Sequence, residues 1–165
     1  MKKLLIALLL ISNAALAQKM AQTGIIYKKH PDIEVMRKLA TLYEKGDADG
    51  MAKFYDEKVQ FIGMGRYVVG VPSKNRTLAE AKDGWKNVID HWDDLKMTET
   101  QPPVALQYSN GPLVVHSWWL ISLTNKKTRK KAIVDMVLFD EFNREGKIIS
   151  QRQYYDPNQL IDASK

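Results

Sequence analysis

The residues with the clearest capacity for proton chemistry are His116 and Asp135. Each lies in a segment with the composition of a β-strand, and a short run rich in lysine and arginine joins the two segments. If the tip of this hairpin has two or four residues, Asp135 lies opposite His116 or Trp118, on the same face as His116. A carboxyl group buried beside an imidazole can share a proton with it and hold a shifted pKa suited to acid–base catalysis.

The same pair has a simpler interpretation, as an ordinary polar pair across two strands. Residues 113–123 are apolar at both odd and even positions, so the pattern does not reveal which face of the strand is buried. A tip of three residues would separate His116 from Asp135. Trp118 and Trp119 must point to opposite faces, so one is expected in the pocket or core and the other at a subunit interface.

Other kinds of chemistry have less support in the sequence. His91 and Asp94 have the spacing of a helical i, i+3 pair, but a helix end is usually solvated, so we expect no metal site. The chain has no cysteine, which excludes disulfides and thiolate chemistry. It also has no glycine-rich phosphate loop and no serine nucleophile elbow, and we expect no cofactor.

The first 17 residues have the pattern of a cleaved signal peptide. Two lysines precede an apolar run, and the small-residue pattern Ala15-Leu16-Ala17 follows it. The run is too short to span a bilayer of about 30 Å, so we expect a secreted or periplasmic protein without a membrane anchor. Residues 18–31 are then expected to form a flexible lead.

A cluster of basic residues marks the predicted hairpin tip: Lys126, Lys127, Arg129, Lys130 and Lys131. Such a run can bind anions, including nucleic acid. No aromatic side chains alternate with these charges, as a platform for stacked bases would need. We therefore expect a solvated hairpin tip and no nucleic-acid partner.

The elements that would position these residues form an α+β domain. Pro31 and Asp32 begin a helix that ends at Gly46, Asp47 caps a short second helix, and Thr77 with Glu80 forms a capping box before a third. A short strand is predicted at residues 59–62, before the third helix, and further strands follow that helix at residues 104–108, 113–124, 131–142 and 147–155. This order favours about three N-terminal helices packed on a curved antiparallel sheet.

Two stretches resemble the NTF2-like superfamily, and its SnoaL-like branch in particular. They are residues 40–59, ATLYEKGDADGMAKFYDEKV, and residues 142–160, FNREGKIISQRQYYDPNQL. The resemblance covers residues 32–162 as one domain, and it implies a cone-shaped fold with one pocket and a homodimer formed through the sheet.

The resemblance also gives expectations for the site. Ketosteroid isomerases of this fold use an aspartate and a tyrosine. The matching positions here fall on or next to Ile62 and on Leu39, which disfavours that mechanism because aliphatic groups cannot transfer protons. SnoaL-type polyketide cyclases use an aspartate supported by a histidine, which suggests Asp135 and His116. The residues expected to line the pocket are Tyr55, Ile62, Trp85, Trp118, Tyr154 and Asp156, although a turn cap is the simpler role for Asp156.

The hypothesis favoured by the sequence is an exported domain that binds an apolar or aromatic small molecule. One alternative is a cofactor-free lyase, isomerase or cyclase that uses Asp135 with His116 as acid and base. Another is a dimeric protein-interaction module that uses the outer face of the sheet.

Overall fold

The structure, a computed structural model, describes residues 24–63 and 75–165. The predicted signal peptide and most of the connection after β2 lie outside the described residues. In chain order the elements are β1 (Gly24–Tyr27), α2 (Pro31–Glu44), α3 (Ala48–Ala52), β2 (Tyr55–Gly63), α4 (Leu78–His91), β3 (Trp92–Tyr108), β4 (Leu113–Asn125), β5 (Lys131–Phe142), β6 (Ile148–Tyr155) and α5 (Asn158–Ser164).

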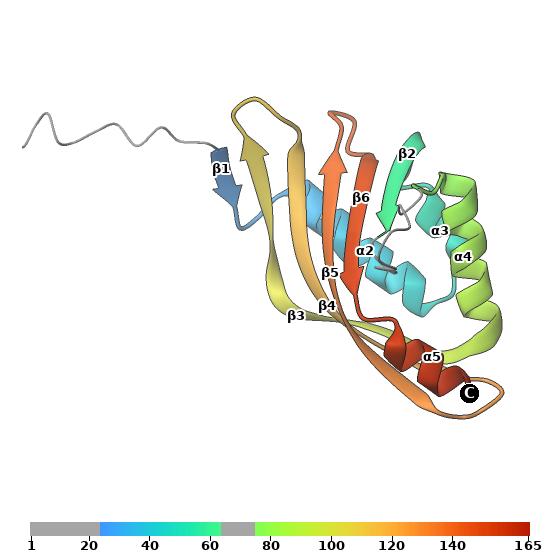
Figure 1. The fold of residues 1–165 in the computed structure, drawn as a ribbon. Helices are drawn as coiled ribbons and strands as arrows, with labels where there is room; N and C mark the ends of the chain where they lie inside the picture. The colour runs from blue at the N-terminus through green and yellow to red at the C-terminus, as the bar shows by residue number, and fades with distance from the viewer. Residues whose placement is uncertain (1–23, 64–74) are drawn as a thin grey trace, which may run out of the picture.

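One curved sheet carries the helices on its concave side, as Figure 1 shows. The described strands form a six-stranded sheet in the order β1-β3-β4-β5-β6-β2. All neighbouring strands pair antiparallel except β2 and β6, which run parallel, so the expectation of a wholly antiparallel sheet was wrong at this edge. The long strands β3, β4 and β5 bend beneath the helices and close one end of the molecule (Figure 1).

The three predicted N-terminal helices are present as α2, α3 and α4. The capping box at the start of α4 is confirmed, because the side chains of Thr77 and Glu80 each bind the other residue's backbone. The described residues contain a fourth helix, α5, which the sequence analysis did not predict. None of the described helices is long and apolar enough to cross a membrane.

Helix α5 is short, which explains why the sequence analysis considered only a turn at its start. It has seven residues, and its N-cap residue, Pro157, makes no side-chain cap hydrogen bond. Contacts with distant residues hold it instead: the Thr128 hydroxyl donates to the Ala163 carbonyl at 2.5 Å, and the Ile133 amide donates to the Gln159 side chain at 3.2 Å. Tertiary packing therefore determines this helix.

Two strand predictions also need correction. Residues 24–27, placed in the predicted flexible lead, form β1 and pair with β3. Strand β3 begins directly after α4 and is much longer than the predicted segment 104–108. Its pairing with β4 shifts register around Pro102 and Pro103, and prolines within a strand pattern normally argue against a strand.

The basic hairpin tip is anchored to the molecule. The Lys126 ammonium group donates to the Ile89 carbonyl at 2.9 Å, and the Arg129 guanidinium group donates to Asp93 at 3.0 Å. Both contacts join the tip to the junction between α4 and β3. Part of the positive charge at the tip thus stabilises the fold.

Candidate functional site

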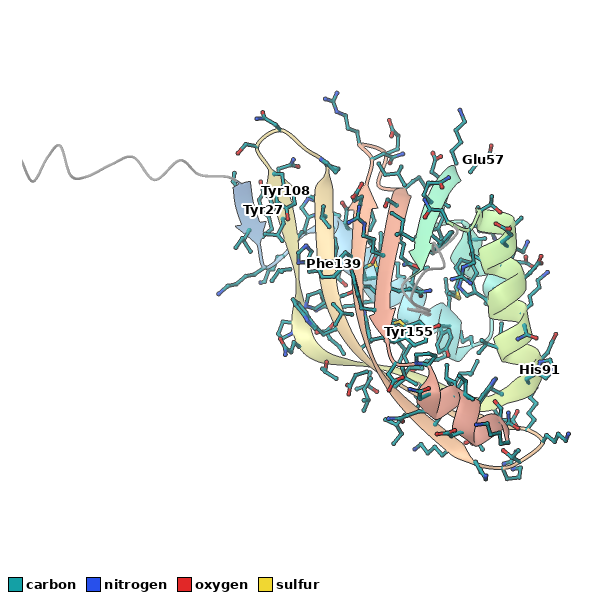
Figure 2. The ribbon with its side chains drawn as sticks, in the orientation of Figure 1. Tyr27, Glu57, His91, Tyr108, Phe139 and Tyr155 are labelled. Atoms are coloured by element: carbon teal, nitrogen blue, oxygen red, sulfur yellow. The ribbon has the colours of Figure 1, made fainter. Side chains whose placement is uncertain are left out.

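Strand alternation gives the sheet two distinct faces. On β4 the odd-numbered residues from 115 to 125 are buried, and on β5 the even-numbered residues from 132 to 142 are buried or half-buried. These side chains face the helices, and we call this side the cavity face and the other the outer face. Figure 2 labels a residue of each face, Tyr155 on the cavity face and Phe139 on the outer face.

A cavity of about 630 Å³ lies between the cavity face and the helices. This volume falls within the roughly 300–1,000 Å³ usual for small-molecule sites. Apolar side chains from both layers line it, including Met36, Leu39, Val88, Met97, Ile121, Val134 and Leu138. Leu160 and Ile161 of α5 complete one side, so the unpredicted helix is part of the wall.

An aromatic cluster forms part of the wall near the start of β2. The Tyr55 ring packs against Phe61 at a centroid distance of 5.0 Å and against Trp85 at 5.4 Å. Phe61 and Trp85 meet edge to face at 5.8 Å. These contacts between β2 and α4 fix the Tyr55 ring, and with it the position of the hydroxyl group.

One polar part of the site is a chain of three side chains. The Gln151 amide nitrogen donates to the Asp140 Oδ1 atom at 2.6 Å and to the Tyr55 hydroxyl oxygen at 3.2 Å. Strand register places Asp140 between Val115 of β4 and Gln151 of β6. Tyr55 and Gln151 line the cavity, whereas Asp140 lies behind them with no exposed surface.

Burial determines the charge of this polar chain. It raises the pKa of Asp140 to about 8, although the hydrogen bond from Gln151 acts in the opposite direction. Asp140 is therefore mainly neutral at pH 7. Burial and the nearby Asp140 carboxyl group also raise the pKa of Tyr55, which keeps its hydroxyl protonated. This hydroxyl accepts from Gln151, and its own hydrogen has no acceptor among the described residues.

Asp140 has one further unusual property. Its Oδ2 atom is buried and has no hydrogen-bond partner among the described residues. A buried unpartnered carboxyl oxygen costs about 1–3 kcal/mol, so such groups usually have a role other than stability. Here the role that the geometry allows is to orient the Gln151 amide against the cavity.

The predicted pair His116 and Asp135 lies on the outer face. The expected register is wrong, because Asp135 pairs with Leu120 and His116 pairs with Phe139. The two residues do share a face, as predicted. They are too far apart along the strands because the last pair of the β4–β5 hairpin is Thr124 with Lys131, which leaves a tip of six residues, 125–130. The Asn125 side chain stabilises this longer tip by accepting from the amides of residues 127 and 128.

His116 has a different neighbour from the one expected. Its ring meets Phe139 edge to face at 4.4 Å, and Phe139 meets Tyr154 in the same way at 5.5 Å. Burial lowers the pKa of His116, which favours the neutral ring in this aromatic cluster. His116 and Asp135 are thus too far apart to share a proton, and neither side chain faces the cavity.

Two of the six residues expected in the pocket, Tyr55 and Trp85, line the cavity. The other four are not among its described lining residues. Ile62 follows Phe61, whose buried side chain points to the cavity side, and Trp118 likewise precedes the buried Trp119. Adjacent strand residues point to opposite faces, which explains both corrections.

The remaining two expected residues also lie elsewhere. Tyr154 is on the outer face against Phe139 and is 38% exposed. The Asp156 carboxylate accepts from the Asn158 amide at 3.0 Å, which is the turn-capping role considered in the sequence analysis.

Asp140 and Gln151 were missed by the sequence analysis, although the sequence contains a signal for Asp140. The even positions of residues 132–142 read Ala, Val, Met, Leu, Asp and Phe. A single carboxyl group among apolar residues that alternate along a strand is expected to be buried with them. A buried polar residue of this kind often marks a functional site. No such pattern distinguishes Gln151.

Solved structures with a similar fold come from several kinds of protein. A candidate isomerase from Bacillus subtilis superposes with a TM-score of 0.64 at 19% identity, over 79% of this chain and 90% of that one. An NTF2-like protein from Burkholderia xenovorans LB400 superposes with a TM-score of 0.55 at 18% identity, over 81% of this chain and 95% of that one. This chain has the NTF2-like fold.

A third structure with the NTF2-like fold is a candidate polyketide cyclase from Streptomyces antibioticus. Its TM-score is 0.64 at 13% identity, over 82% of this chain and 99% of that one. No protein-family model matches the sequence, and no curated protein matches it. At these identities the similarity establishes the fold, and the function must be argued from the cavity.

Proposed function

We propose that this chain binds an apolar or aromatic small molecule in the cavity between the sheet and the helices. The observation that carries the proposal is a mainly apolar cavity with a neutral, hydrogen-bonded polar site at Tyr55 and Gln151. An apolar body provides most of the binding free energy through burial, and one polar contact fixes orientation. The ligand would therefore place a carbonyl or similar acceptor against the Tyr55 hydroxyl.

The test uses N-phenyl-1-naphthylamine, a neutral aromatic probe whose fluorescence increases in apolar surroundings. We expect wild-type protein to enhance its emission, and Met136→Trp to remove most of the enhancement by filling the cavity that Met136 lines. Val137→Trp is the matched control, because its neighbouring position lies on the outer face. Circular dichroism checks that both variants fold. Equal enhancement by the two variants would contradict binding in the cavity.

Cofactor-free catalysis, as in a lyase, isomerase or cyclase, is a second candidate function. The Tyr55 hydroxyl, held by Gln151 and Asp140, is well placed to stabilise a developing oxyanion. The polar groups that the described residues offer to the cavity are hydroxyls, amides and the cations Arg76 and Lys165, which donate or accept hydrogen bonds but are poor bases at neutral pH. Binding therefore has the stronger support.

The outer face supports a further proposal, pairing with a second copy of the chain. Ile133 is 43% exposed there, and the aromatic cluster of His116, Phe139 and Tyr154 lies on the same face. Exposed apolar surface of this kind is typical of interaction sites. Light scattering after size exclusion should give a dimer mass for wild-type protein and a monomer mass for Ile133→Glu. A wild-type monomer at every concentration would overturn the proposal.

Export is the remaining part of the proposed function, and residues 1–17 carry it. Expression of the full chain in a bacterium should yield periplasmic protein whose mass corresponds to a start at Gln18. Cytoplasmic protein of full mass would contradict cleavage and export.

A further inference from the structure

One cation that lines the cavity has no side-chain partner among the described residues. Arg76 and Lys165 are the charged residues among its described lining. Lys165 is 72% exposed at its side chain and pairs with Asp162 at 3.3 Å, so its charge is already balanced. Arg76 is half-buried, and no ion pair or side-chain hydrogen bond joins its guanidinium group to another described residue.

Backbone contacts hold Arg76 in this position. Its amide donates to the Phe61 carbonyl and its carbonyl accepts from the Phe61 amide, both at 3.0 Å. This bridge joins Arg76 to β2 beside the aromatic cluster. The guanidinium group lies against α4 at Gly84, where an added Cβ atom would be 3.4 Å from Nη1. Strand and helix thus present the arginine to the cavity from a fixed backbone.

A half-buried guanidinium group without a partner is costly, since buried charges are normally paired. The guanidinium fork matches a carboxylate, to which it can donate two hydrogen bonds. The Asp140 carboxyl group is not available to it, because Asp140 is held by Gln151 and is fully buried behind it. The missing negative charge is therefore expected on the ligand.

We propose that the ligand is an apolar organic anion, such as an aliphatic or aromatic carboxylate, whose acid group binds Arg76 while its body occupies the apolar cavity. This inference rests on the proposed binding function and narrows its ligand class. The net charge of the chain, +6, would be +4 without Lys2 and Lys3 of the predicted signal peptide, and this positive charge would also favour the encounter with an anion.

The test compares two ligands with the same apolar chain, decanoate and decan-1-ol, as competitors of N-phenyl-1-naphthylamine at neutral pH. For wild-type protein we expect decanoate to displace the probe at a concentration about tenfold lower, as expected for one charge-assisted hydrogen bond. Arg76→Gln should remove the preference. Arg152→Gln, which removes the same charge from an exposed position on β6, should retain it.

The outcomes separate this inference from the function on which it rests. If the probe binds but decanol competes as well as decanoate, the cavity binds apolar molecules and the assignment of an anionic ligand is overturned. If the preference survives Arg76→Gln or disappears in Arg152→Gln, the role of Arg76 is overturned. If wild-type protein does not bind the probe, both proposals fail together.

Discussion

Strand β5 carries two aspartates with opposite surroundings, one on each face of the sheet. Asp135 is exposed on the outer face opposite Leu120. Asp140, five residues later, has no exposed surface and holds the Gln151 amide at 2.6 Å. Because side chains alternate along a strand, an odd separation places two like residues in different environments. The face, more than the residue type, thus determines which carboxyl group can act on the cavity.

The largest expected difference between the two faces is in stability. Trp119 on the cavity face should stabilise the fold more than Trp118 on the outer face. Trp119 is 2% exposed on the cavity face, and its indole N–H donates to the Ser117 hydroxyl at 2.8 Å. We expect Trp119→Ala to lower the free energy of unfolding by about 3–5 kcal/mol. Trp118→Ala on the half-buried outer face should cost clearly less. Urea denaturation of the two variants measures the difference, and equal losses would show that the two faces contribute equally.

The second difference concerns pH, and it arises from Asp140. Burial raises its pKa to about 8, whereas an aspartate in the unfolded chain titrates near about 4. The folded state therefore holds a proton that the unfolded state has lost between these values. The contribution of Asp140 to stability should therefore be fully present below about pH 4 and should fall as pH rises towards 8, by about a few kcal/mol.

Two variants isolate the contribution of Asp140 to this pH dependence. Asp140→Asn has a permanently neutral side chain and should flatten the fall in stability, as measured by urea midpoints across the pH range. Asp135→Asn makes the same chemical change at an exposed position and should keep the wild-type slope. An unchanged slope in Asp140→Asn would mean that Asp140 does not titrate as its burial implies.

Much of the fold could be predicted from the sequence because local signals determine it. The capping box of Thr77 and Glu80, the Gly46 helix end and the alternating strands 131–142 each specify one element without reference to the rest of the chain. Where tertiary contacts decide, prediction was wrong. Helix α5 depends on Thr128 and Gln159, and the register of β4 with β5 depends on the length of the turn after Asn125.

The candidate site was harder to predict than the fold, for a related reason. Residues 113–123 are apolar on both faces, so the sequence does not orient β4, and His116 could not be assigned to a face. The stripe that contains Asp140 carried the missing information on β5. Gln151 becomes significant only through its contacts with Asp140 and Tyr55, which come from distant parts of the chain.

A smaller difference between the faces should appear in their tyrosines. Tyr55→Phe removes the acceptor for one Gln151 N–H, which would leave a buried donor unpaired at a cost of about 1–3 kcal/mol. Tyr154 is exposed on the outer face, and Tyr154→Phe should change stability by less than about 0.5 kcal/mol. Chemical denaturation compares the two. Equal and negligible effects would indicate that the Tyr55 hydroxyl has no role in the polar chain.

The smallest expected effect concerns the residues that first suggested chemistry. His116→Gln and Asp135→Asn alter the outer face, where His116 contacts Phe139 and Asp135 is exposed. We expect both variants to bind N-phenyl-1-naphthylamine with wild-type affinity, because neither side chain reaches the cavity. Tyr55→Phe is the positive control, since Tyr55 lines the cavity and a change there should alter the affinity. A large loss of affinity in either outer-face variant, with Tyr55→Phe unaffected, would place the binding site on the outer face. Asp135, and not Asp140, would then be the aspartate of β5 that lies on the side of the ligand.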